Sequence, residues 1–378
     1  MPEARVAIVG GGLSGLYAAT LLAENGIDDY VVLEARTAFG GRIASVSYVA
    51  APLTSGAEDR PVRDRFDLGA TWFWPAMHPD LQQLVASLGL ETFPQDEAGD
   101  MLIERSRAHP PSRIDGFLSA PPAVRVRGGM LALTEALRVR LPADNLVSGC
   151  EVKRLVPYNG YVEVNAVDMQ GHAVSYDVAH VLVAIPPRLA ANSIVFAPAL
   201  PSAVTRQWHA RGTWMAPHAK YLAIYDRPFW RERGLSGNAR SAVGPMVEIH
   251  DASAPDGWGA LFGFLSVPAQ VRRQIPEAAL YAHCRAQFVR LFGDGAAMPV
   301  AEFLKDWATD PYTAIAADRD PDAQHGAWLP ATVSEGPWRH RITGIASEWS
   351  PSFPGYVAGA VDAARRGVEA MLRKEDVR

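Results

Sequence analysis

A glycine-rich turn close to the N-terminus constrains the fold of this chain more than any other feature. Residues 5–9 (RVAIV) are apolar and β-branched, which predicts a short buried strand. A Gly-x-Gly-x-x-Gly motif follows at once over residues 10–15, and residues 16–25 have the apolar spacing of a helix that ends at Gly26. A second apolar strand is expected over residues 29–33. This order of elements predicts a βαβ unit, and with it a parallel sheet.

The residues of this turn have physical roles in binding a dinucleotide. Gly10 permits the tight turn, Gly12 lets the backbone approach a pyrophosphate, and Gly15 allows the helix to pack closely on the strand. The helix N-terminus, which holds Ser14, offers unpaired N–H groups and a positive dipole to phosphates. Glu34, at the end of the second strand, can accept hydrogen bonds from ribose hydroxyls. The alternative is a glycine-rich turn that serves packing alone.

A second glycine pair follows the acidic residue. Gly40 and Gly41 precede Arg42, and Arg36 lies a few residues before them. The glycines leave room for a cofactor against the backbone, and the arginines can balance phosphate charge. This pattern favours a cofactor longer than NAD, such as FAD. The simpler alternative is a turn that carries a solvated arginine.

Composition excludes several other classes of protein. The 378 residues suit two to three domains, and the net charge is −5, which argues against a nucleic-acid partner. Cys150 and Cys284 are far apart, which excludes a disulfide scaffold or a thiolate zinc site and suits a reducing compartment. No apolar stretch reaches the ~20 residues of a membrane helix. We therefore expect a cytoplasmic protein without a metal, a nucleic-acid partner or a membrane span.

The two motifs also carry a resemblance to a known family. Residues 6–26 (VAIVGGGLSGLYAATLLAENG) and 31–42 (VVLEARTAFGGR) resemble the flavin amine oxidases, which include monoamine, polyamine and L-amino-acid oxidases. The similarity continues through most of the chain. It implies an α/β fold with a discontinuous FAD-binding, Rossmann-like domain of the glutathione-reductase type and an α+β substrate domain. The implied ranges are 1–93, 128–208 and 307–378 for the FAD-binding domain, and 94–127 and 209–306 for the substrate domain.

Further segments resemble the parts of that family that surround the flavin. Residues 66–72 (FDLGATW) resemble the stretch that lies over the flavin ring, and a last helix that begins at Val357 would direct its N-terminus to the flavin. The resemblance places Val152 against adenine, Trp307 beside the flavin and Glu348 near the ribityl and phosphate groups. Together with the motifs, it assigns the following residues to FAD: Gly10, Gly12, Ser14, Gly15, Glu34, Arg36, Gly41, Arg42, Gly69, Ala70, Thr71, Trp72, Val152, Trp307, Glu348, Tyr356 and Val357.

Lys220 is the first candidate for a catalytic residue. It lies in the alternating strand expected over residues 219–225, on the same face as Leu222 and Ile224. A lysine on a buried face needs a partner or a lowered pKa. The resemblance implies that it holds a water at flavin N5. The alternative is a solvated lysine at a strand edge.

Tyr356 is the second candidate for a catalytic residue. It matches one wall of the family's cage of two aromatic rings, which holds the substrate nitrogen next to the flavin. The position of the second ring is Ala317, so we expect the two-ring cage to be absent unless Trp72, Trp74 or Tyr312 replaces it. For Tyr356, the alternative is a ring that packs at the start of a helix.

The resemblance also bears on how the flavin is held and how the cavity is closed. The position that bonds covalently to flavin in monoamine oxidases is Ala316, so we expect noncovalent FAD, with both cysteines buried as small apolar residues. The segment 96–127 is much shorter than the corresponding helical part of the substrate domain in the family. This implies a reduced lid and a more open cavity, or a homodimer in which a second subunit closes it.

The expected activity is oxidation of an amine or amino acid to an imine, by hydride transfer to flavin N5. Molecular oxygen or another acceptor would then reoxidise the flavin. Two alternatives stay open at this point. One is a related FAD-dependent dehydrogenase or desaturase that acts on a carbon–carbon bond, and the other is a flavin-binding protein without turnover.

Overall fold

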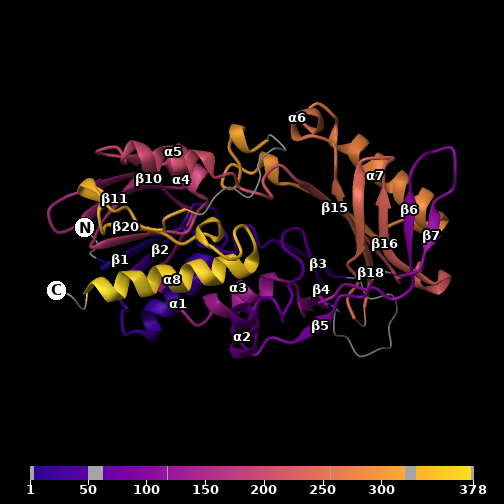
Figure 1. The fold of residues 1–378 in the computed structure, drawn as a ribbon, viewed down its shortest axis with the longest axis horizontal. Helices are drawn as coiled ribbons and strands as arrows, with labels where there is room; N and C mark the ends of the chain where they lie inside the picture. Colours follow the sequence, from indigo (N-terminus) through magenta and orange to yellow (C-terminus); the bar gives the residue numbers. More distant parts are fainter. Residues whose placement is uncertain (1–3, 50–62, 117, 256, 320–328, 376–378) are drawn as a thin grey trace.

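The computed structural model describes residues 4–49, 63–116, 118–255, 257–319 and 329–375. Figure 1 shows an elongated molecule with a helix-covered parallel sheet at one end and a large, mainly antiparallel sheet at the other. The domain ranges expected from the sequence also include residues outside the described ones, and they stay a prediction.

The parallel sheet is built on the predicted βαβ unit. Its strand order is β20-β13-β1-β2-β9, and every pairing is parallel. All four residues of β1 and all five of β2 are buried, as expected for strands that are covered on both faces. The strands of this sheet are β1 (Val6–Val9), β2 (Tyr30–Glu34), β9 (Leu146–Ser148), β13 (His180–Val183) and β20 (Ile342–Gly344).

The two faces of this sheet pack against different layers. Ile8, Val32 and Leu182 point into one core together with the apolar sides of four helices. Ala7 and Val9 point into the other core, which the second sheet covers. The helices are α1 (Leu13–Glu24), α2 (Pro79–Ser87), α3 (Leu131–Arg138) and α8 (Val357–Glu375).

The second sheet has the strand order β12-β11-β10-β14. Its strands are β10 (Cys150–Pro157), β11 (Val162–Asp168), β12 (Ala173–Val178) and β14 (Val195–Phe196). The helices α4 (Pro187–Ser193) and α5 (Ser202–Ala210) lie beside it.

The large sheet forms the other end of the molecule and has the order β19-β15-β18-β17-β16-β6-β7. Tyr221 and Ala223 of its strand β15 point into a core with α7, while Leu222 and Ile224 point toward Phe66 on the opposite face. Its strands are β6 (Asp100–Glu104), β7 (Ser112–Ile114), β15 (Ala219–Tyr225), β16 (Leu235–Ser241), β17 (Met246–Asp251), β18 (Gly259–Leu265) and β19 (Ala301–Asp306), and its helices are α6 (Ala269–Arg272) and α7 (Glu277–Phe292). Two short antiparallel pairs join the halves, namely β3 (Ser45–Val49) with β4 (Arg63–Asp67) and β5 (Thr92–Pro94) with β8 (Val124–Val126).

The fold class expected from the sequence is confirmed, with two corrections in detail. The apolar run over residues 177–187 predicts one buried strand, but β12 ends at Val178 in the second sheet and β13 begins at His180 in the parallel sheet. The chain therefore passes from one sheet to the other at Ala179. The sequence does not indicate this change, because the residues on both sides are apolar. The segment 96–127 forms strands, and β6 pairs in parallel with β16 to extend the large sheet.

No helix among the described residues is long and apolar enough to cross a membrane. The cytoplasmic location and the homodimer expected from the sequence stay predictions.

Candidate active site

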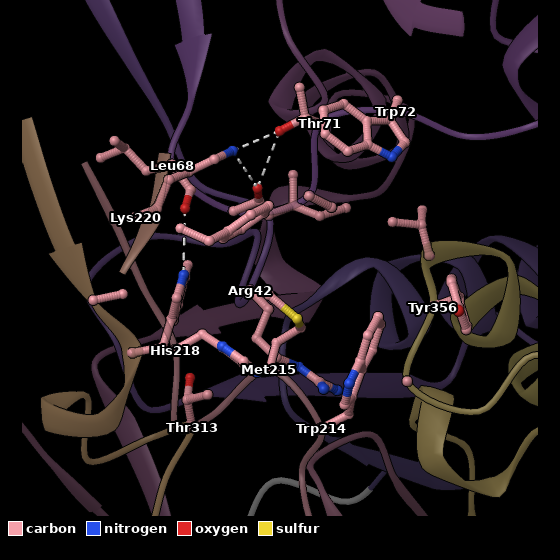
Figure 2. Close-up of a pocket in the computed structure, with 18 of the residues that line it drawn as sticks. Arg42, Leu68, Thr71, Trp72, Trp214, Met215, His218, Lys220, Thr313 and Tyr356 are labelled. Atoms are coloured by element: carbon pink, nitrogen blue, oxygen red, sulfur yellow. Dashed lines mark hydrogen bonds between the residues drawn. The ribbon is translucent and has the colours of Figure 1, made fainter. Parts of the chain in front are cut away.

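A single cavity of about 1100 Å³ runs from the β1–α1 turn to the large sheet. Its lining includes the glycine turns at one end, Lys220 and Trp72 in the middle, and strands β6, β16 and β17 at the other end. Of the residues that the sequence assigns to FAD or catalysis, all but Gly15, Val152 and Glu348 line this cavity. Figure 2 shows the middle part, where Lys220, Thr71, Trp214 and Tyr356 face the same space.

The β1–α1 turn has the backbone geometry that a phosphate site requires. Gly10 has a φ of +107°, and a Cβ on Gly15 would lie 2.0 Å from the Gly10 carbonyl oxygen, so both positions exclude other residues. Helix α1 begins without a side-chain cap and without an acidic residue in its first turn. Its first N–H groups and its positive dipole end therefore remain available to an anion. Ser14 Oγ donates to the Ile345 carbonyl at 2.5 Å, which joins this turn to the C-terminal segment.

Glu34 is held rigidly at the end of β2. Its two carboxylate oxygens accept hydrogen bonds from the backbone N–H of Gly11 at 2.7 Å and of Arg36 at 2.9 Å. The Arg36 side chain is held in turn by Asp310 Oδ1 at 2.7 Å and lies over the Tyr312 ring. Each carboxylate oxygen has a further lone pair, which can accept a ribose hydroxyl. Glu34 therefore needs no rearrangement to bind a sugar.

The second glycine turn lies directly against the first. The backbone N–H of Gly40 donates to the Gly11 carbonyl at 2.9 Å, and a Cβ on Gly41 would lie 3.3 Å from Gly12 Cα. Arg42 follows and forms a double hydrogen bond with the Glu348 carboxylate, at 2.5 and 3.0 Å. Burial alone would raise the pKa of Glu348, but the Arg42 guanidinium outweighs it and lowers the pKa. Glu348 therefore contributes by holding Arg42, since it does not line the cavity itself.

Lys220 lies at the junction of the two halves and is 1% exposed. Its Nζ donates to the carbonyl oxygens of Asp67 at 2.9 Å and Gly69 at 3.1 Å. It also contacts Thr71 Oγ1 at 2.6 Å (Figure 2). The Phe262 ring covers the ammonium at 3.9 Å. Burial lowers the pKa of Lys220 to about 7, although the Asp67 carboxylate opposes the shift. Lys220 is therefore a group that can change its charge near neutral pH.

Trp307 follows strand β19, the neighbour of the Lys220 strand, and lines the cavity. The Trp307 indole N–H donates to the Leu68 carbonyl at 3.3 Å, and its backbone N–H donates to the His218 carbonyl at 3.0 Å. The Lys305 ammonium lies over the indole at 4.4 Å. These contacts fix the Trp307 ring against the segment that follows β4, so it presents a rigid planar surface to the cavity.

The structure places a ring beside Tyr356 that differs from the three substitutes named from the sequence. Of the three substitutes proposed from the sequence, Trp72 packs against His250 and Phe262, Trp74 against His78, and Tyr312 against Arg36. Instead the Trp214 ring lies 5.1 Å from the Tyr356 ring, tilted by 38°. Trp214 belongs to the loop between α5 and β15, where neither helical nor strand periodicity draws attention to a single side chain. The frequency of tryptophan in the cavity-forming segments suggests an aromatic pocket, but it does not single out Trp214.

The part of the cavity in the large sheet was also missed by sequence analysis. Apolar side chains of β6 and β7 form one wall of it: Met101, Ile103 and Ile114. Glu248 and His250 on β17 line another wall, and the two side chains approach to 3.1 Å. A hydrogen bond from His250 lowers the pKa of Glu248, so its carboxylate is charged at neutral pH. The segment expected to be a reduced lid therefore supplies part of the cavity wall.

The residues present fit a bound FAD. The turn excludes side chains where a pyrophosphate would approach, an uncapped helix end and Arg42 provide positive charge, and Glu34 is preset for a ribose. Val152, by contrast, belongs to β10, is buried in the core there and does not line the cavity. Among the described residues no cluster of three or more His, Cys, Asp or Glu side chains is arranged to hold a metal ion.

The buried Lys220 makes the stability of the protein depend on pH in a defined direction. Its pKa is about 7 in the folded protein and near 10.5 in the unfolded chain, so between these values the unfolded chain binds the extra proton. The free energy of unfolding should therefore rise with pH across this window, relative to a Lys220→Met variant. Chemical denaturation of both proteins from pH 6 to about 10.5 measures the difference.

Lys153→Met is the control, because it removes a lysine from the surface. We expect this variant to keep the pH dependence of the parent. Parallel curves for the parent and Lys220→Met would contradict the lowered pKa.

Comparison with known proteins agrees with this geometry. The model of the family described as flavin containing amine oxidoreductase matches residues 104–372, and that of the NAD(P)-binding Rossmann-like domain matches residues 8–88. Putrescine oxidase of Kocuria rosea is 27% identical over 242 residues, which cover 59% of this chain and 48% of the relative. L-amino acid dehydrogenase of Synechocystis is 27% identical over 211 residues, covering 52% of this chain and 41% of the relative. The chain thus spans about half the length of the curated relatives it matches.

Solved structures share the whole fold. A putrescine oxidase bound to putrescine has a TM-score of 0.79 at 21% identity, with 98% of this chain and 99% of that chain covered. Cyclohexylamine oxidase from Brevibacterium oxydans has a TM-score of 0.78 at 19% identity, with 99% and 100% covered. At such identities the likeness shows the fold alone. The family match over residues 104–372 shows more: the chain belongs to the flavin-containing amine oxidoreductases.

Proposed function

We propose that this protein binds FAD noncovalently and oxidises an amine or amino acid to the corresponding imine. When bound, FAD would accept a hydride from the carbon next to the substrate nitrogen at its N5 atom, and oxygen or another acceptor would reoxidise it. Water would then hydrolyse the imine to a carbonyl compound.

The observation that carries the proposal is the continuity of the cavity. The same space that begins at the glycine turns and Glu34 passes Lys220 and the Trp214–Tyr356 ring pair and ends among side chains of the large sheet. A dinucleotide held by the turns would thus have its reactive end where the substrate enters. A site that only binds a dinucleotide would not need the part of the cavity that reaches the side chains of the large sheet.

The residues of this chain have distinct roles in the proposal. Tyr356 and Trp214 present aromatic faces that would orient the substrate nitrogen, because such faces attract amines and ammonium groups. Lys220 would control the local charge next to the reacting centre. The apolar side chains Met101 and Ile103 would exclude bulk water from the carbon that is oxidised.

The position of the cysteines supports noncovalent binding. Cys150 is 2% exposed and Cys284 is fully buried, and each lies in a core away from the cavity lining. Burial raises the pKa of Cys284 to about 12, so its reactive thiolate is scarce at neutral pH. Ala316, which the resemblance aligns with the covalent attachment position, carries no nucleophile.

The names of the relatives refer to different substrates and acceptors, so experiment must identify those of this protein. They include an oxidase named for a diamine and a dehydrogenase named for L-amino acids. We expect an amine with an apolar body, because apolar side chains dominate the walls supplied by β6 and β7.

Anaerobic titration of the FAD-loaded protein tests the activity directly. We expect at least one amine or amino acid in a panel of both to bleach the flavin absorbance near 450 nm. The Tyr356→Leu variant should slow this reduction by about ten- to a hundredfold, because it removes one aromatic face while leaving the cavity apolar. Rapid-mixing spectroscopy measures the rate.

Two outcomes would contradict the proposal. If no amine reduces the flavin but a cyclic compound with an oxidisable carbon–carbon bond does, the protein is a dehydrogenase or desaturase of the related type. If neither kind of compound reduces it, the protein binds flavin without turnover. Val139→Leu, an exposed change far from the lining, is the matched control and should reduce at the parent rate.

Alanine substitutions at two glycines of the same motif should have different effects, one on FAD binding and one on stability. A Cβ on Gly12 would find 3.9 Å of space within the protein but would point toward the site of the pyrophosphate, so Gly12→Ala should fold normally and bind FAD at least tenfold more weakly. A Cβ on Gly15 would clash with the Gly10 carbonyl, so Gly15→Ala should destabilise the apoprotein by about 1–3 kcal/mol. Thermal unfolding and FAD titration separate the two effects. Equal FAD affinity in Gly12→Ala and the parent would contradict the cofactor position.

A further inference from the structure

The environment of Lys220 contains one hydrogen-bond partner that differs in kind from the other two. The carbonyl oxygens of Asp67 and Gly69 can only accept hydrogen bonds, whereas the Thr71 hydroxyl can accept or donate. A charged ammonium has three N–H donors, and these three acceptors satisfy all of them. The charged form of Lys220 is therefore fully bonded although the residue is buried.

The neutral form of Lys220 requires a different pattern. A neutral amine has two N–H donors and one lone pair, so the two carbonyls can keep their hydrogen bonds only if the third partner donates. Thr71 can do so by rotating its hydroxyl, which otherwise has the Gly69 carbonyl within reach at 3.3 Å. Figure 2 shows the triangle formed by Lys220 Nζ, Thr71 Oγ1 and this carbonyl.

We propose that Thr71 is the positioning residue that lets Lys220 change its charge inside the site, by accepting a hydrogen bond from the ammonium and donating one to the neutral amine. Neither charge state then leaves a buried polar group without a partner, which would be costly. Thr71 is 6% exposed and lines the cavity, so the lysine charge is coupled to whatever occupies that space. The hydrogen-bond switch is a property of the protein alone, whereas its effect on catalysis rests on the proposed amine oxidation.

The other charged groups around Lys220 are already engaged. The Asp67 carboxylate accepts from Ser45 Oγ at 2.5 Å and from the Met130 N–H at 2.9 Å, and the buried Arg125 donates to the carbonyls of Ser253 and Ala252.

On the neighbouring strand β19, Lys305 pairs with Asp310 at 2.9 Å. His250 lies behind the Phe262 ring and is held by Asn238. These groups contribute a constant electrostatic field around Lys220. Among the three hydrogen-bond partners of Lys220, only Thr71 can change from acceptor to donor.

Substitution of Thr71 tests the proposal with the matched pair Thr71→Val and Thr71→Ser. Valine keeps the shape of threonine without the hydroxyl, and serine keeps the hydroxyl. A hydrogen bond to a charged group is about twice as strong as a neutral one, so loss of the hydroxyl penalises the ammonium more than the amine. We expect Thr71→Val to lower the pKa of Lys220 by about one pH unit and Thr71→Ser to stay close to the parent.

The measurement is an NMR titration of protein labelled with ¹³C at lysine Cε. The chain has four lysines, and the signal that disappears in Lys220→Met belongs to Lys220. A pKa in Thr71→Val equal to that of the parent would overturn the proposal, and so would an equal shift in Thr71→Ser. If Thr71→Val does not fold, the pKa of Lys220 is measured in Thr71→Ala instead, with the same expected shift.

A second readout separates this inference from the proposed function. The pH profile of flavin reduction by an amine should shift in Thr71→Val in the same direction as the NMR titration, and Thr71→Ser should restore it. If no amine reduces the flavin while the NMR shift is present, the proposed function fails and the switch stands. If amines reduce the flavin while the titration is unchanged, the switch is overturned and the function stands.

Discussion

The hydrogen bonds of one buried lysine join the two halves of this molecule. Lys220 belongs to the large sheet, and its carbonyl acceptors belong to the last residue of β4 and to the segment that follows it. Because an unpartnered ammonium is costly in the protein interior, the backbone at Asp67 and Gly69 must stay within hydrogen-bonding distance of β15. Gly69 is fixed from its other side as well, since a Cβ there would lie 2.0 Å from the Arg42 carbonyl. The second glycine turn, the Gly69 segment and the lysine strand therefore hold one another in place.

Much of the nucleotide half could be predicted because its determinants are local. The strand–turn–helix order around Gly10, Gly12 and Gly15 depends on residues within about ten positions of one another, and the structure reproduces it with a helix that begins three residues earlier than expected. The Lys220 strand was predictable from alternation, and its bounds agree with residues 219–225. In these places the hydrophobic period and the neighbouring turn residues specify the same conformation.

The missed features depend on contacts between residues far apart in the chain. Strands β6 and β7 lie in a stretch rich in proline and arginine, and β6 is ordered by pairing with β16, which is more than a hundred residues away. Trp214 reaches Tyr356 from a loop, so no periodicity indicates it. The passage from β12 to β13 has the sequence pattern of one strand, because the residues on both sides of it are apolar. Local patterns do not contain these pairings, and only the folded chain reveals them.

The fold is shared with amine oxidases that are about 20% identical, so the particular chemistry depends on the lining of the cavity. The proposed function requires FAD to occupy the part of that lining that includes Gly12, Glu34 and Lys220. The most direct measurement is to incubate the purified protein with FAD, remove the excess, denature the protein and quantify the flavin in the filtrate and on the chain. The account predicts about one FAD per chain, all of it in the filtrate. Protein that takes up no FAD would contradict the cavity assignment, and flavin retained on the denatured chain would contradict noncovalent binding.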